Sequence, residues 1–353
     1  MKKVYTLAAL AAMTILGASC NSEWEQEQYE HYISFSSRLD SKGVTNIYIP
    51  YSRHDEEGNY TEGGEGRSNY QLPVLVSGTT DNTKNITVHI AHDSDTLGIL
   101  NYAQYATRTE LYYEDMGIEG LTYSSYPETM EIEANKNKGL LDLKFDFRNI
   151  DMSEKWVLPL KIVDDASYGY QAHPRKNYAK AILRIFPFND YSGDYSGTGL
   201  TNKVVTGYNG NGEPIETAES ITRSSVRGYV VDEQSIFFYS GIVDEDYTDR
   251  KKYKIKFTFN GEKNGSVTIS CANAEEIGFQ VNQSITPSFR ISSAMDEAQP
   301  YLEHRYVIIN NIDYYFNYMP VEGTSIRYHV KGTLTLSRDI NTQIPDEDQA
   351  IEW

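Results

Sequence analysis

Alternation of apolar and polar residues with a period of two dominates the chain. It is clearest at residues 253–259, where tyrosine, isoleucine and phenylalanine alternate with lysine and threonine. The same pattern recurs at residues 86–90, 141–147, 156–162 and 326–336. Because successive side chains of a strand point to opposite faces, this pattern predicts antiparallel strands with one buried and one solvated face. One short helix is expected near residues 100–114, so the chain is predicted to be all-β.

A break between two structural units is predicted at residues 187–190, where a strand ends in the sequence Pro-Phe-Asn-Asp. Residues 29–187 hold roughly seven or eight short strands separated by turns, which is typical of an immunoglobulin-like β-sandwich. Residues 188–340 hold roughly nine strands joined in order by short turns, which favours an antiparallel β-barrel or a curled β-sandwich. Residues 341–353 are expected to form a tail.

The N-terminal residues have the features of a bacterial lipoprotein leader. Lys2 and Lys3 precede a short apolar stretch that ends in Gly-Ala-Ser before Cys20. This stretch is too short for a comfortable membrane span, so residues 1–19 are predicted to be a cleaved signal peptide with Cys20 as the lipidation site. Gly17 stands where a lipobox usually has leucine, and a plain secretory signal is the alternative. Several acyl chains on Cys20 would be the protein's only attachment to a membrane.

Residues 20–28 form a predicted acidic tether after this cysteine. The stretch resembles the signal that sends Bacteroidetes lipoproteins to the outer surface, although an ordinary polar linker is equally compatible with it. We therefore expect a lipid-anchored protein at the cell surface, on the outer membrane.

Charge and cysteine content narrow the classes of partner and chemistry. The net charge of −18 argues against a nucleic-acid partner, because such binding requires lysine and arginine to neutralise phosphates. Once Cys20 is acylated, Cys271 has no cysteine with which to form an intramolecular disulfide. Cys271 ends an alternating strand pattern and is expected to point into a core. The 29 tyrosines are the unusual feature of the composition.

Two sequence segments resemble a known Bacteroidetes family. Residues 156–162 read Trp-Val-Leu-Pro-Leu-Lys-Ile, and segment 44–186 around them resembles the domain of unknown function 1735, in which tyrosine is common where this chain has Trp156. Residues 188–195 read Phe-Asn-Asp-Tyr-Ser-Gly-Asp-Tyr and resemble the opening of the domain of unknown function 4361. Such lipoproteins are similar to surface glycan-binding proteins encoded beside SusC/SusD-type transporter pairs. The resemblance implies capture of a glycan, including host N-glycans for some relatives, and its delivery to the transporter.

A glycan site needs flat aromatic faces for sugar rings together with amides and carboxylates for hydroxyl groups. If the second unit is an up-and-down meander, alternate turns lie at the same end. Counting strands from Tyr191 groups the candidate ligand-binding residues on one end: Tyr208, Asn211, Asp244, Asp246, Tyr247, Arg250 and Tyr301. Ordinary packing or capping is the alternative for each tyrosine.

Tyr315 is the candidate on the other end, together with Tyr318. Alternation places Tyr314, Phe316 and Tyr318 on one face, as a continuation of Tyr306 and Ile308, and that face is expected to be core. Tyr315 then lies on the opposite face and is the better ligand contact.

An enzymatic role finds no support in the sequence motifs. The seven histidines show no zinc-binding spacing, and no nucleophile elbow, phosphate loop or dinucleotide motif occurs. Residues 244–249 are rich in carboxylates but lack the spacing of a known calcium loop. We therefore predict no cofactor, no metal and no catalytic residues. A structural or adhesive protein that binds other proteins and a glycoside hydrolase remain as alternatives.

Overall fold

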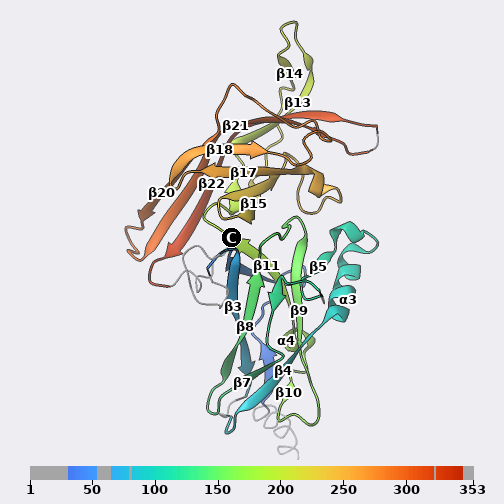
Figure 1. Ribbon diagram of the computed structural model, residues 1–353, viewed down its shortest axis with the longest axis vertical. Coiled ribbons are helices and arrows are strands. Elements are labelled where there is room, and N and C mark those ends of the chain that lie inside the picture. The colour runs from blue at the N-terminus through green and yellow to red at the C-terminus, as the bar shows by residue number, and fades with distance from the viewer. Residues whose placement is uncertain (1–30, 54–64, 79–81, 119, 322, 345–353) are drawn as a thin grey trace, which may run out of the picture.

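The structure, a computed structural model, describes residues 31–53, 65–78, 82–118, 120–321 and 323–344. The predicted leader, Cys20 and the acidic tether lie outside these residues. The chain forms two β-rich bodies stacked along the long axis of the molecule (Figure 1). The all-β prediction is confirmed. No helix among the described residues has the length and apolar character needed to cross a membrane.

The first body consists of two sheets that enclose a core. One sheet has the order β10-β1-β3-β8-β6, and the other has the order β2-β11-β9-β4-β7 with β5 added beside β9. Buried side chains from both sheets, such as Leu72 and Leu183, belong to one continuous core cluster. The strand bounds are Tyr32–Phe35 (β1), Thr45–Pro50 (β2), Arg67–Val76 (β3), Ile86–His92 (β4), Tyr113–Asp115 (β5), Ser124–Ser125 (β6), Thr129–Ile132 (β7), Lys138–Asp146 (β8), Lys155–Ile162 (β9), Gln171–Ala172 (β10) and Lys180–Phe188 (β11).

The expected helix is α3, Ser94–Tyr105, which begins six residues earlier than predicted. It packs Leu97 and Tyr105 against Val157 of β9, so β9 is covered on both faces. Trp156 is half-buried at the start of β9, where its indole nitrogen donates to the Asp151 carbonyl. The remaining short helices are Thr109–Leu111 (η1), Lys176–Ala179 (α4) and Arg250–Tyr253 (η2).

The second body contains a closed barrel of eight antiparallel strands. Around the barrel the order is β22-β12-β15-β16-β17-β18-β20-β21, and β21 pairs with β22 to close it. Large aromatic side chains such as Tyr195, Phe257 and Phe316 are fully buried and fill the interior. The barrel strands are Gly193–Ser196 (β12), Ser225–Asp232 (β15), Ser235–Tyr239 (β16), Lys254–Asn260 (β17), Asn264–Ser270 (β18), Ser288–Met295 (β20), Leu302–Tyr318 (β21) and Ile326–Asn341 (β22).

Three further strands widen the barrel wall at one end. Strands β13 (Leu200–Tyr208) and β14 (Pro214–Glu216) form a hairpin that pairs with β22 and projects from the top of the view in Figure 1. Strand β19 (Gln280–Val281) pairs with β21 on the other side. These additions extend the β21–β22 ribbon into a small sheet with the order β14-β13-β22-β21-β19.

Strand β21 changes its inward face part-way along. Val307 and Ile309 point into the core, whereas after the bulge the core positions are Ile312, Tyr314 and Phe316. The extra residue is accommodated at Asn311, which has a positive φ of 59°. The prediction that Tyr306 and Ile308 share the core face of Tyr314 is therefore wrong, because the bulge reverses the alternation between them.

Cys271 is half-buried and packs against the core, as its strand pattern predicts. Burial raises the pKa of its thiol, so the reactive thiolate form is disfavoured.

Candidate functional site

The predicted ligand loops divide between the two ends of the barrel. The end where β21 turns into β22, residues 318–326, is called here the hairpin end. The loop of residues 240–253 lies there, since Tyr247 and Tyr318 contact each other with ring centroids 6.2 Å apart. Tyr208 and Asn211 lie there too, on the β13–β14 hairpin, because β13 runs antiparallel to β22 toward this end.

Tyr301 lies at the opposite end, contrary to the predicted grouping. It precedes β21 at Leu302, which pairs with Asn341 at the end of β22. The strand count differs because β18 and β20 pair directly, while the short β19 between them in sequence lies outside the barrel ring. The Tyr301 hydroxyl donates to the side chain of Gln299 within its own turn.

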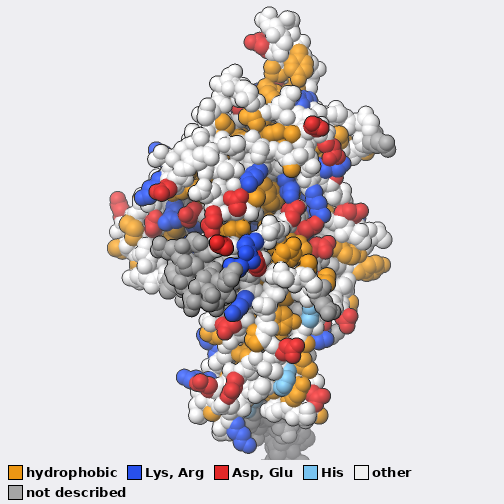
Figure 2. All heavy atoms as spheres, in the orientation of Figure 1, with side chains coloured by type: hydrophobic (Ala, Val, Ile, Leu, Met, Phe, Trp, Pro, Cys, Tyr) orange, Lys and Arg blue, Asp and Glu red, His pale blue; other side chains and the backbone are white. Residues whose placement is uncertain are grey.

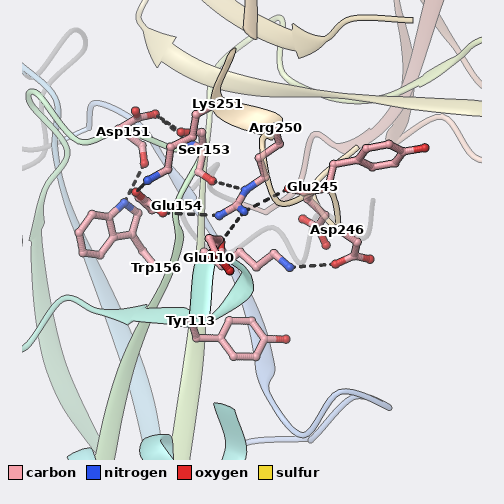
Figure 3. Close-up of polar contacts among 12 residues, drawn as sticks. Glu110, Tyr113, Asp151, Ser153, Glu154, Trp156, Glu245, Asp246, Arg250 and Lys251 are labelled. Carbon is pink, nitrogen blue, oxygen red and sulfur yellow. Dashed lines mark hydrogen bonds and ion pairs between the residues drawn. The ribbon is translucent and has the colours of Figure 1, made fainter. Parts of the chain in front are cut away.

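Arg250 is fully buried and holds the two bodies together (Figure 3). Its Nε donates to the Ser153 carbonyl at 2.9 Å and its Nη1 to the Glu110 carbonyl at 2.6 Å, both in the first body. Its Nη2 lies 3.5 Å from Glu154. The placement of Arg250 in a ligand site is therefore corrected, because its donors are occupied by the other body and no part of it is exposed.

The carboxylates of the same loop also face cations. Asp246 pairs with the buried Lys155 of the first body at 2.8 Å, and Asp244 pairs with Arg223 at 3.2 Å. Figure 2 shows charges of both signs interspersed across the middle of the molecule, where the bodies meet, whereas the upper part of this face is largely uncharged. Pairing with cations leaves these oxygens poorly suited to hold calcium.

Glu245 is the most strongly held carboxylate of this interface. It accepts from Arg184 at 2.6 Å and from the Tyr229 hydroxyl at 3.1 Å. Burial opposes its ionisation, yet the charge and hydrogen bonds of Arg184, with Lys42 and Lys155, hold the pKa of Glu245 well below its usual range. The cavity lined by Glu245, Arg184 and Tyr229 has a volume of ≈ 10 Å³, which is room for a water and not for a sugar.

Tyr315 lies on the outward face of the small sheet at the hairpin end. It sits directly across from His329 of β22, and the two rings stack with centroids 4.1 Å apart and an interplanar angle of 10°. The Arg327 guanidinium lies 5.4 Å from the centre of the Tyr315 ring. Tyr315 is half-buried, with the imidazole stacked on its ring and the guanidinium over it, so the residue is partly accessible at the surface.

Carboxylates and cations surround this ring pair. His329 bonds through Nε2 to Asp313 at 2.8 Å and through Nδ1 to Glu216 of β14. Lys203 lies 3.6 Å from Glu216. Partial burial raises the pKa of Tyr315, and the charges of Asp313 and Glu216 add to this effect. The Tyr315 platform is defined as Lys203, Glu216, Asp313, Tyr315, Arg327 and His329.

Tyr208 extends this platform on the β13–β14 hairpin. Its side chain is 58% exposed, and its charge adds to the rise in the pKa of Tyr315. The structure therefore places Tyr208 and Tyr315, which were predicted on opposite ends, at the same end of the barrel. The other platform residues were missed, although the alternation in β22 marks Arg327 and His329 as outward-facing.

The platform combines an aromatic ring with hydrogen-bonding groups in fixed positions. Arg327 donates to the Gly278 carbonyl at 2.6 Å and to the side chain of Gln280 at 2.7 Å, which anchors the guanidinium beside Tyr315. Such a surface can hold a flat, hydroxyl-bearing ligand. Within the described part of the chain, no three histidine, cysteine or acidic side chains are arranged to bind a metal ion.

The chain is highly similar to a protein of known structure. The chain is 83% identical to an auxiliary nutrient binding protein from Bacteroides thetaiotaomicron whose crystal structure is known; the match covers 92% of this chain and 100% of that one, with a TM-score of 0.84. The chain belongs to the family of this protein. No curated protein sequence matches it.

More distant solved structures in the family come from Bacteroides ovatus. One, described as a multidomain protein including DUF1735, is 40% identical over 91% of this chain and 100% of that one, with a TM-score of 0.74. Another, a protein of unknown function, is 34% identical; the match covers 92% of this chain and 97% of that one, also with a TM-score of 0.74. These relatives confirm that the chain belongs to a Bacteroidetes family.

Two family models match the chain itself. Residues 24–166 match the domain of unknown function DUF4973, and residues 179–335 match a model described as "-like, C-terminal". The first unit therefore matches a differently numbered domain from the 1735 domain that the sequence resembles, although a 40% identical relative carries that name.

Proposed function

We propose that this protein is a surface lipoprotein that binds a glycan nutrient at the Tyr315 platform without altering it. The observation that carries the proposal is the 83% identity to an auxiliary nutrient binding protein, over the whole of that chain. The platform supplies the chemistry that such a ligand needs, namely a tyrosine ring beside anchored charged groups.

The way the platform carboxylates are engaged supports binding without hydrolysis. A glycosidase needs two carboxyl groups free to act on either side of the scissile bond. Here Asp313 and Glu216 both bond to His329, and Asp313 is almost fully buried. Their role in the proposal is to orient His329 and Tyr315.

Delivery to a SusC/SusD-type transporter is the further step that we propose. The leader-like sequence before Cys20 supports a lipid anchor on the outer membrane, and the acidic tether supports display at the cell surface. Replacing Cys20 with alanine should release the protein from the membrane fraction, and co-purification of the wild-type chain with a SusC/SusD pair would test the partnership.

Calorimetry with a defined glycan panel tests the binding proposal. The chain from residue 21 to residue 353 would be titrated with starch, dextran, yeast mannan, xylan, galactan and released N-glycans. We expect saturable binding of at least one panel member, with no new reducing ends after prolonged incubation. Tyr102→Ala is a matched control, because Tyr102 is 68% exposed on α3 in the other body. Absence of binding to every member, or release of reducing ends, would contradict the proposal.

A further inference from the structure

The bulge in β21 places a second exposed tyrosine on the same outward face as Tyr315. Tyr306 and Tyr315 are nine residues apart, an odd separation that would put them on opposite faces of a regular strand. The added residue at Asn310–Asn311 restores the same face to both. Tyr306 is 36% exposed, with its neighbours Val307 and Ile309 turned into the barrel.

Tyr306 is flanked by small side chains on both neighbouring strands. It pairs with Ser292 of β20 and with Ser337 of β22. Tyr306 remains 36% exposed between these short neighbours, so a ligand can approach it from above the sheet. On the adjacent row, His304 bonds to Asp296 at 3.0 Å and to Asp339 at 2.6 Å, which fixes polar groups beside Tyr306.

The surface between the two tyrosines is polar and hydrogen-bonding. The connecting strip consists of the outward residues Ile308, Asn310, Lys331, Thr333 and Thr335. At ~3.3 Å per residue, the two tyrosines are separated by about 30 Å at most along the strand. A protein interface of this length would be expected to have an apolar centre, whereas four of these five strip residues present hydroxyl, amide or ammonium groups and only Ile308 is apolar.

We propose that the outward face of β21 and β22 binds an extended oligosaccharide that runs from the Tyr315 platform across the strip to Tyr306. This inference rests on the proposed function and deepens it, because it makes the ligand a chain of several sugars and not a mono- or disaccharide. The strip is continuous with the Tyr315 platform, and Tyr306 and Tyr315 at its two ends give a chain two aromatic contacts joined by hydrogen-bonding groups. A chain that reaches both positions gains affinity because its second contact is intramolecular.

A length series of one glycan tests this proposal. The probe is a size-fractionated ladder, from disaccharide to dodecasaccharide, prepared from the panel glycan that binds, and affinity is measured by calorimetry. We expect the wild-type affinity to rise with length to a plateau. Tyr306→Ala should weaken the longest oligosaccharides about tenfold and leave the shortest unchanged, while Tyr315→Ala weakens every length.

The variant Tyr306→Phe, which keeps the ring, should retain the increase of affinity with oligosaccharide length. The unfolding temperatures of both Tyr306 variants show whether they are folded. Wild-type affinity for the long chains in Tyr306→Ala, an equal loss at every length, or a length-independent wild-type affinity would each overturn the inference while leaving the proposed function intact. A ladder with no binding member, or Tyr315→Ala binding like the wild type at every length, would instead overturn the proposed function at the platform.

Discussion

Two charged clusters of this protein differ in what encloses them. The interface cluster, built around Arg250 and Glu245, is covered by both bodies, and its charges bond to groups far away in sequence. The Tyr315 platform lies on an outward sheet face, where its charges surround a half-exposed ring. The carboxylate-rich loop of residues 244–250 therefore holds the two bodies together, whereas the outward face of β21 and β22 has the features of a ligand site.

The largest expected effect on stability comes from Arg250→Met. This change leaves the Ser153 and Glu110 carbonyls without their donor inside the interface, so the free energy of unfolding should fall by about 3 kcal/mol. Glycan affinity should change less than twofold in the folded variant. Chemical denaturation and calorimetry measure the two quantities. A stability loss below about 1 kcal/mol, or a loss of glycan binding by the folded variant, would contradict the assignment of a structural role to the interface cluster and a binding role to the Tyr315 platform.

A smaller effect, of about 2 kcal/mol at neutral pH, is expected from Glu245→Gln, because Arg184 would lose its charged partner. The pKa of Glu245 is lowered in the folded protein from an ordinary value of 4.5. Its contribution is therefore present above pH 4.5 and lost as the pH falls below that value. Unfolding at a series of pH values should give a shallower acid decline for the variant. Parallel declines would mean that Glu245 does not carry this dependence.

Tyr315→Ala should have the reverse signature. Glycan affinity should fall about tenfold or more, since the ring is the aromatic contact of the platform, while the unfolding free energy changes by about 1 kcal/mol or less. Tyr102→Ala should bind like the wild type. Comparable affinities of the two variants would remove the platform from the account.

The smallest effect is expected from Asp246→Asn. Asp246 is more than half exposed, and the buried Lys155 keeps its contact with the Tyr105 ring, so the change should cost only about 1 kcal/mol. The effect of the Asp246 change should depend more on salt than that of the Glu245 change, because the Asp246 carboxylate is exposed to screening by ions and Glu245 is largely buried. A double-mutant cycle with Lys155→Met measures the coupling free energy between Asp246 and Lys155. A coupling above about 2 kcal/mol would show that Asp246, like Glu245, acts as a buried charge.

Local alternation was sufficient to predict most of the fold. The run from Tyr253 to Phe259 has its apolar positions in the barrel core, and the 188–340 segment forms a barrel, which was one of two predicted forms. Alternation reports only which neighbours share a face, so it holds until a strand is interrupted. The bulge at Asn311 is such an interruption. The sequence Asn310-Asn311 does not predict that a bulge occurs there or which of the two residues forms it.

The candidate site was less predictable because its partners are distant in sequence. Arg250 looks like a ligand residue until the first body supplies Ser153 and Glu110, about 100 and 140 residues away. Tyr315 was predicted correctly to face outward, since that depends only on its neighbours. The surroundings of Tyr315 were not predicted. Glu216 comes close to His329 only because β13 pairs with both β14 and β22, and the sequence does not specify the pairing of β13 with β22.

The central claim is that a glycan is held on the outward sheet face and not by the charged loop between the bodies. A crystal structure of the chain with the shortest oligosaccharide that binds it tests this claim most directly. The account predicts a sugar ring against Tyr315, with hydrogen bonds from Arg327 or Lys203 and an unchanged interface around Arg250. A sugar bound to the loop of residues 244–250, with Tyr315 uncovered, would contradict it.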